Sequence, residues 1–241
     1  MPAAMNKQQL FTQVHTLLQK HFTLPTDDIQ RTVFEQVIYA ICREGSTRGL
    51  ADPAFRNLQT FFDWNEVRVS SVREIAEAIE MLPEPEARAR RIVRFLQEWF
   101  EMTYSFDMEE LTRKGGLREA SKKLSRLENL SDFIIAFVIQ HGLGGHAVPV
   151  DAPAMRVLHR LQVIEAEEDS MEAARGTVEH YVTKTRGPGF TDLVSVLAHE
   201  ICTDRNPRCG SCPLQSECPS AYTVAATAAP RPESPSPRKP R

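Results

Sequence analysis

The chain has 241 residues, of which 41% are hydrophobic and 25% charged, the composition of an ordinary soluble protein with one large domain or two compact ones. Its longest apolar run is far too short to cross a bilayer and its first residues lack a signal-peptide pattern, so we expect a cytoplasmic protein without membrane contact. The net charge of -3 provides no general attraction for nucleic acid, so any such binding must depend on local basic patches.

Helical periodicity dominates the sequence. Apolar residues recur at helical spacing almost everywhere and strand-type alternation is nearly absent, so the sequence predicts an all-α fold. The first two predicted helices cover residues 10–18 and 34–41, and the second ends at Gly45. Asp52 followed by Pro53 is typical of an N-cap with proline at the first helical position, which predicts that the next helix begins there.

Further helices are predicted in the rest of the chain. Ser71 begins a capping-box pattern, and a long amphipathic helix is expected after the prolines at 83 and 85. The run 133–139 is apolar on every face and predicts a central core helix. Asp151 follows an extended V-P-V stretch and is predicted to cap the helix after it. The remaining helices are predicted near 108–113, 117–126, 167–183 and 191–202.

Four cysteines lie in one short segment, CTDRNPRCGSCPLQSEC: Cys202, Cys209, Cys212 and Cys218. Four thiolates in one loop can surround a compact cofactor, which favours a metal or cluster over a distributed disulfide framework. Three interpretations compete: a [4Fe-4S] cluster, a structural zinc site, and a coincidental group of thiols or disulfides. Zinc sites usually use two separated C-x2-C pairs, so the single tight pair here favours iron and sulfur. Cys42, in the apolar second helix, is predicted to be a small core residue.

This cysteine spacing at the end of an all-helical chain, with an Asp after V-P-V upstream, resembles the endonuclease III branch of the helix-hairpin-helix DNA glycosylases. The segment PRCGSC is especially similar to that branch's cluster loop, and the resemblance covers about residues 7–219. It implies a two-domain fold, with double-stranded DNA bound in the cleft between the domains, and we expect a monomer. The expected parts are a helical barrel at 28–148, a [4Fe-4S] domain made of 1–27 and 149–222, and a disordered basic tail at 223–241.

The resemblance also implies a catalytic role for Asp151, although Ala152 and Pro153 replace the usual Thr and His after it. A helix N-cap and a catalytic carboxylate are compatible functions, because a carboxylate at a helix start in a cleft can also stabilise a sugar cation or activate water. At Gly45 the family often has a glutamine that fills the gap left by an extruded base. The residues beside Gly45, including Arg43 and Glu44, are candidates for DNA contact, but nothing in the sequence specifies which.

The hairpin is where this chain departs from the family. A gap-free count back from Asp151 places the phosphate-binding turn, usually of L-P-G-V-G type, at Leu127–Ser131. The sequence there is L-E-N-L-S, which lacks glycine and adds negative charge, so we expect weak phosphate binding. The same count places Phe133 where bifunctional members carry a lysine that attacks the sugar, and phenylalanine cannot form a Schiff base. Lys122 and Lys123 lie before the turn, where a surface role is favoured over supplying that amine.

Basic residues are concentrated locally. The candidate DNA contacts are Lys122, Lys123 and Arg126 before the turn and Arg205 and Arg208 in the cysteine loop. Arginines at 88, 90, 91 and 94 form another group, for which an ordinary solvated helix face is equally reasonable.

The leading hypothesis is a DNA-binding base-excision-repair protein. It would be an N-glycosylase on damaged or mismatched bases, without lysine-dependent lyase activity. The second hypothesis is a noncatalytic iron–sulfur protein that binds DNA or lesions. A zinc-stabilised helical interaction domain is the third.

Overall fold

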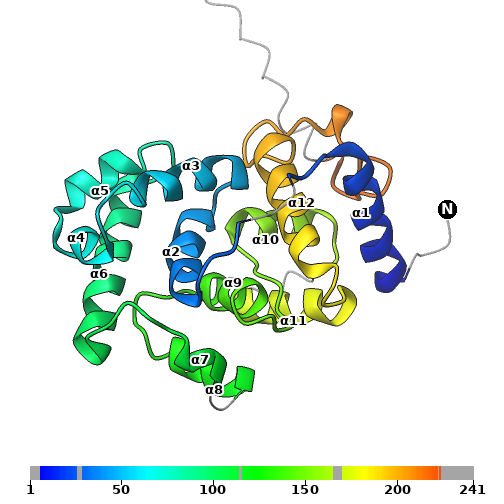
Figure 1. Ribbon diagram of the computed structural model, residues 1–241. Helices are drawn as coiled ribbons and strands as arrows, with labels where there is room; N and C mark the ends of the chain where they lie inside the picture. The colour runs from blue at the N-terminus through cyan, green and yellow to red at the C-terminus, as the bar shows by residue number, and fades with distance from the viewer. Residues whose placement is uncertain (1–5, 26–28, 114–115, 165–169, 222, 224–241) are drawn as a thin grey trace, which may run out of the picture.

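The computed structural model describes residues 6–25, 29–113, 116–164, 170–221 and 223, and these form helices with no strand (Figure 1). The prediction of an all-α fold is therefore confirmed. The predicted tail lies outside the described residues except for Thr223. The helices are α1 (Lys7–His21), α2 (Val33–Arg43), α3 (Arg48–Leu58), α4 (Trp64–Val69), α5 (Val72–Ala78), α6 (Pro85–Thr103), α7 (Glu110–Arg113), α8 (Gly116–Leu124), α9 (Asp132–His141), α10 (Ala152–Arg160), α11 (Met171–Tyr181) and α12 (Gly187–Glu200), followed by a short 3₁₀ turn (Cys209–Ser211).

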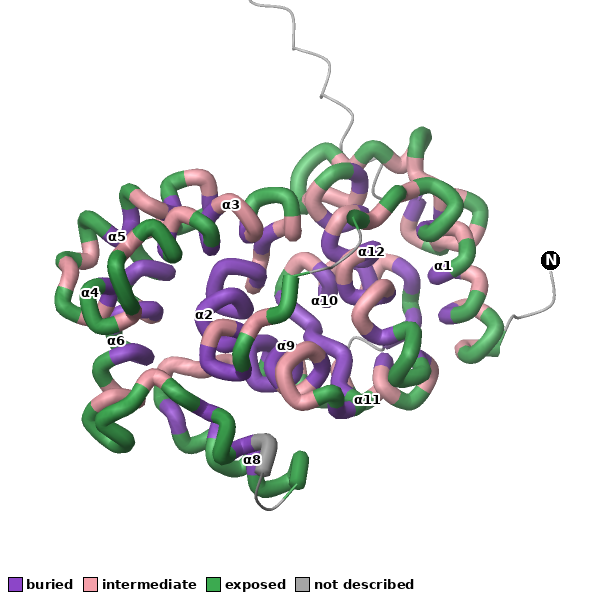
Figure 2. Tube along the Cα trace, viewed as in Figure 1, coloured by how far each residue is buried: buried purple, intermediate pink, exposed green. Residues whose placement is uncertain are grey.

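Two clusters of buried apolar side chains underlie the fold. The first extends from α2 to α9, and the second combines α1 with residues 148–214 (Figure 2). The chain therefore returns its first helix to pack against its last, as α1 beside α12 shows in Figure 1. α9 is buried along most of its length, as the apolar run 133–139 predicts, and Cys42 is fully buried in α2. No helix in the described part of the chain has the length and apolar character needed to cross a membrane.

Most helix starts follow their local sequence signals. Thr32 and Ser71 each accept a backbone N–H three residues on and complete a capping box with the Glu at that position. Ser131 caps α9, with its Oγ accepting from the N–H of Ile134. Asp151 caps α10, as predicted.

The predicted helix start at Asp52 is wrong. α3 begins at Arg48, and Pro53 lies inside it, where its missing N–H costs one backbone hydrogen bond. Asp52 is held instead by side chains: the Tyr39 hydroxyl donates to it over 2.5 Å and Arg48 forms an ion pair with it. Burial, followed by the hydrogen bond to Asp52, raises the pKa of Tyr39 far above its ordinary value, so this hydroxyl stays protonated and remains a donor. Tertiary contacts have overridden the local cap signal.

The C-terminal end of α2 is closed by a side chain from α6. Arg88, which is buried, donates to the carbonyl oxygens of Pro83 (2.6 Å), Ile41 (2.5 Å) and Glu44. The last carbonyls of a helix have no intrahelical partner, so a buried end needs such donors. Gly45 follows with a φ of +64°, a left-handed conformation that glycine adopts without strain.

A second arginine joins the two hydrophobic clusters. Arg43, the last residue of α2, has a side chain only 2% exposed and forms an ion pair with Asp192 of α12 over 2.6 Å. It also donates to the carbonyl oxygen of Ser46. This contact ties the end of α2 to the C-terminal half of the chain.

Replacing Arg88 by methionine is expected to lower the free energy of unfolding by about 3 kcal/mol, because it leaves buried carbonyls at the end of α2 without donors. Arg90→Met on the same helix is the matched control. Arg90 forms an exposed pair with Glu86, and its loss should change stability by less than about 1 kcal/mol. Urea unfolding followed by circular dichroism measures both, and equal losses in the two variants would contradict the capping role.

Candidate functional site

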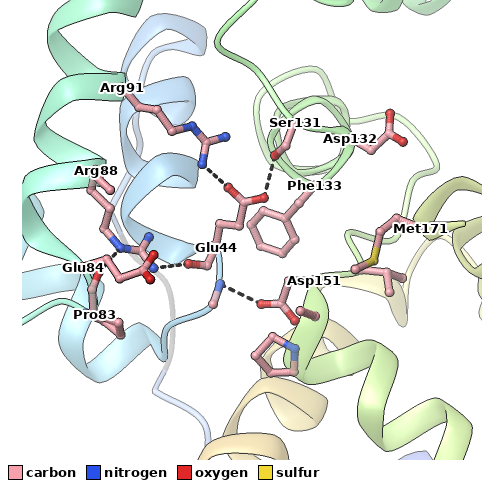
Figure 3. Close-up of a pocket in the computed structure, with 15 residues that line it drawn as sticks. Glu44, Pro83, Glu84, Arg88, Arg91, Ser131, Asp132, Phe133, Asp151 and Met171 are labelled. Carbon is pink, nitrogen blue, oxygen red and sulfur yellow. Dashed lines mark hydrogen bonds and ion pairs between the residues drawn. The ribbon is translucent and has the colours of Figure 1, made fainter. Parts of the chain in front are cut away.

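A cavity of about 570 Å³ lies where the end of α2 meets the starts of α6, α9 and α10 (Figure 3). Its lining comes from segments far apart in the sequence: residues 44–45, 83–91, 131–133 and 150–153, with Met171 of α11. It is therefore bordered by both hydrophobic clusters. The ionisable and hydroxyl side chains of the lining are Glu44, Glu84, Asp132, Asp151, Arg88, Arg91 and Ser131.

Asp151 lies in the cavity wall at the start of α10 and is 6% exposed. Its Oδ1 accepts from the N–H of Ala154 over 2.8 Å, which is the N-cap bond. Its Oδ2 accepts from the N–H of Gly45 over 2.9 Å (Figure 3). Because both oxygens accept a hydrogen bond, these donors fix the orientation of the carboxylate. The Asp151 side chain thus both caps α10 and lines the cavity.

Glu44, at the end of α2, also lines the cavity. Its side chain is 23% exposed, and its two oxygens accept from Arg91 Nη1 over 2.5 Å and from the Ser131 hydroxyl over 2.7 Å (Figure 3). An arginine of α6 and a serine of α9 therefore hold one carboxylate from the end of α2. Sequence reasoning named Glu44 only as a neighbour of Gly45 and did not connect it to Arg91, because nothing in the local pattern indicates a partner 47 residues away.

The backbone of Gly45, which directly follows Glu44, contacts both Asp151 and His199. Its N–H donates to Asp151, and its carbonyl oxygen lies 3.1 Å from Nε2 of His199 in α12. This glycine stands where the resemblance places a glutamine. A backbone N–H, which no sequence pattern assigns, positions the candidate catalytic carboxylate.

Phe133 lines the cavity and is otherwise buried. Among the described residues that line the cavity there is no lysine. Lys122 and Lys123 are exposed on α8 and do not line it. The interpretation of both lysines as surface residues agrees with this placement.

The degenerate turn, residues 127–131, has its donors occupied from within the protein. The Glu98 carboxylate accepts from the backbone N–H of Glu128 over 3.2 Å and from the Asn129 side chain over 3.1 Å. Arg91 Nε donates to the Asn129 carbonyl oxygen. A phosphate that approached this turn would meet a carboxylate already bound there, which supports the expectation of weak phosphate binding.

The four clustered cysteines line a single small cavity of about 30 Å³, together with Arg160 of α10. All are free thiols, and Arg160 Nη1 donates to the Cys202 sulfur over 3.3 Å. Burial raises the pKa of Cys212 to about 11, with a smaller contribution from the neighbouring cysteines. In the described residues, no group of three or more Cys, His, Asp or Glu is arranged to hold a single metal ion. Four free thiols around one cavity are the donor set that a [4Fe-4S] cluster uses, with one thiolate for each iron.

The predicted DNA contacts fall into two groups. Lys122, Lys123 and Arg126 are exposed at α8 and just after it, and Arg205 and Arg208 are exposed in the cysteine loop. In Figure 1, α8 and the cysteine loop lie at opposite ends of the view, with α2, α9 and α10 between them. Arg208 also donates to the Glu200 carbonyl oxygen at the end of α12, so part of its guanidinium is used structurally.

The chain is similar in sequence to two curated plant proteins and in structure to several solved DNA glycosylases. No family model matches the chain. It is 26% identical over 210 residues to the DNA glycosylase/AP lyase ROS1 of Arabidopsis thaliana, covering 79% of this chain and 15% of that protein. It is 24% identical over 172 residues to DEMETER-like protein 3 of the same plant, covering 65% of this chain and 16% of that protein. The chain thus spans about one sixth of the length of these relatives.

Two solved structures match most of the chain. A trapped covalent complex of endonuclease III with DNA has a TM-score of 0.67 and 18% identity, covering 91% of this chain and 98% of that one. A thermostable thymine-DNA glycosylase has a TM-score of 0.63 and 19% identity, covering 90% and 97%. At these identities the similarity establishes the fold.

Proposed function

We propose that this chain, which has the helix-hairpin-helix DNA glycosylase fold of endonuclease III, is a monofunctional DNA N-glycosylase that acts in base excision repair on damaged or mismatched bases. The observation that carries this proposal is the Asp151 carboxylate, fixed by two N–H donors in the wall of the large cavity. Enzymes that act on a base must extrude it from the duplex into a pocket, and this cavity supplies one.

In this reaction Asp151 acts on the sugar while the extruded base occupies the cavity. As the bond between the sugar C1′ and the base nitrogen breaks, its electron pair leaves with the base and positive charge develops on the sugar. The Asp151 carboxylate stabilises that charge and accepts a proton from the water that attacks C1′. Because Gly45 and Ala154 donate to it, the carboxylate needs no reorientation during the step.

The absence of strand cleavage follows from Phe133. A lyase step requires an amine that attacks C1′ and forms a Schiff base. The cavity wall carries an aromatic ring at the position where the resemblance places that amine, and the two candidate lysines are on the surface of α8. The product is therefore an abasic site in an intact strand.

The four-cysteine cavity is the proposed site of a [4Fe-4S] cluster. Cys202, Cys209, Cys212 and Cys218 would ligate it, and when bound it supplies structural cross-linking of the loop rather than a reacting group. Arg160 stands next to this cavity at the C-terminal end of α10, the helix that Asp151 caps. Cluster loss is therefore expected to loosen the helix that positions the carboxylate.

A second candidate function is noncatalytic binding of DNA or lesions. One observation favours it: the Glu98 carboxylate occupies the donors of the turn that anchors phosphate in the family. Under this alternative, the fold and cysteine loop remain but Asp151 serves only as a helix cap. The first experiment below separates the two functions.

Asp151→Asn is expected to abolish base release while DNA binding is retained, because asparagine can still cap α10 but carries no negative charge. Base release is measured on a panel of lesion-containing duplexes, with alkali to cleave abasic sites. Asp63→Asn, which changes the N-cap of α4 outside the cavity, is the matched control and should keep full activity. Release that is equal in wild type and Asp151→Asn would remove Asp151 from the mechanism. Retained binding with no release across the panel would favour the noncatalytic alternative.

Iron and acid-labile sulfide analysis of anaerobically purified protein is expected to give about four of each per chain. Changing Cys212 to serine should lower this content and the thermal stability together. Cys42→Ser is the matched control, because Cys42 is buried in α2 far from the loop in sequence, and it should leave the iron content unchanged. Zinc in place of iron, without sulfide, would contradict the cluster.

Lys122→Glu with Lys123→Glu is expected to weaken duplex binding at least tenfold and to reduce the slope of log affinity against log salt by about two. Lys20→Glu with Lys184→Glu makes the same change in net charge away from α8. Affinity is measured by fluorescence anisotropy at several salt concentrations. Equal losses in both double variants would show that net charge, rather than the α8 surface, governs binding.

A further inference from the structure

The cavity that contains Asp151 is acidic. Four carboxylates line it, and only two guanidinium groups oppose them: Glu44, Glu84, Asp132 and Asp151 against Arg88 and Arg91. Arg88 directs its donors at backbone carbonyls, and Arg91 is paired with Glu44. Glu84 and Asp132 are the two exposed carboxylates of this lining. A base that enters this space meets negative charge and hydrogen-bond acceptors.

The cavity also lacks a group that can protonate a departing base. Asp151 accepts two N–H bonds and Glu44 accepts from Arg91 and Ser131, so both are held as acceptors. The Ser131 hydroxyl donates its one hydrogen bond to Glu44. The described residues of the wall include no histidine, lysine, tyrosine or cysteine to act as a general acid in their place.

An aromatic ring completes the lining. Figure 3 shows the Phe133 ring between Glu44 and Asp151. A cation is attracted to the face of an aromatic ring, and the attraction is stronger where water is excluded. A lysine at this position, as the family resemblance implies, would add one positive charge to the lining. Phenylalanine adds none, so the lining is more negative by one charge unit.

From this lining we propose that the base released is cationic, of the class of purines alkylated on a ring nitrogen. The proposal rests on the glycosylase function argued above and names its substrate class. When the C1′–N9 bond of such a base breaks, the electron pair neutralises the positive charge of the ring, and the base leaves without needing a proton. A neutral base would leave as an anion among carboxylates or would need an acid that the wall does not supply. Water then completes the reaction at C1′, with its proton passing to Asp151.

The test compares single-turnover release from two duplexes that differ at one position, 7-methylguanine as the cationic base and hypoxanthine as the neutral one. Each rate is divided by the spontaneous loss from the same duplex, because alkylated purines depart faster without any enzyme. The rate enhancement is expected to be at least tenfold larger for 7-methylguanine, and Asp151→Asn should remove it for both bases.

Glu44→Gln should lower the enhancement for 7-methylguanine at least tenfold and change that for hypoxanthine less than threefold, because it removes one negative charge from the wall. Glu77→Gln is the matched control: Glu77 also pairs with an arginine, Arg73, but outside the cavity, and its loss should change neither rate. Phe133→Leu keeps an apolar side chain and removes the ring, so it should show the same selective loss. It provides a second variant if Glu44→Gln fails to fold.

The possible failures are distinguishable. Asp151-dependent release with equal enhancements for the two bases, or with both variants affecting the two bases equally, overturns the cationic class and leaves the glycosylase intact. If the rate of base release is the same in wild type and Asp151→Asn for every base, the proposed glycosylase function itself is overturned.

Discussion

The structure depends on how the C-terminal end of α2 is held. The last carbonyls of this buried helix receive the guanidinium of Arg88 from α6, and its final residue, Arg43, pairs with Asp192 of α12. These two arginines fix the backbone of residues 41–46 against both hydrophobic clusters. The next peptide can then direct its N–H at Asp151. A buried polar backbone without donors would cost free energy, so the same contacts that stabilise the fold also place the site.

The chemistry of the cavity depends on the hydrogen-bond partners of the carboxylates and guanidinium groups that line it. Glu44 and Asp151 both line the cavity and both accept hydrogen bonds, while Arg88 donates to backbone carbonyls and Arg91 pairs with Glu44. In the described wall the carboxylates outnumber the guanidinium groups, with Glu44, Glu84, Asp132 and Asp151 against Arg88 and Arg91. An ionised carboxylate suits a sugar cation, and the same field disfavours a departing anion. In the proposed reaction, one electrostatic arrangement would both stabilise the transition state and select the base.

The turn at residues 127–131 donates hydrogen bonds to a carboxylate of the same protein, Glu98. The Glu98 carboxylate binds the N–H of Glu128, and Asn129 contributes a second donor to it. Positioning on DNA would then fall to the basic residues at α8 and in the cysteine loop.

The sequence by itself determined the elements and several side-chain roles. Helical periodicity and the capping signals at Ser71 and Asp151 are local patterns, and each produces its structure through contacts within a few residues, whereas the apolar run of α9 predicts burial against other helices. Cysteine spacing likewise indicated one cavity, because the four thiols lie in one short loop. The predicted helix start at Asp52 failed because distant partners, Tyr39 among them, hold that carboxylate. Only the tertiary structure decided that Arg88 and Arg91 bind acceptors from α2 and the residue after it. It also decided that Glu44 and Asp151 line one cavity and that Glu98 accepts hydrogen bonds from the turn. Those contacts join residues dozens of positions apart, and helix packing, which has no signature in any local stretch of sequence, sets which of them meet.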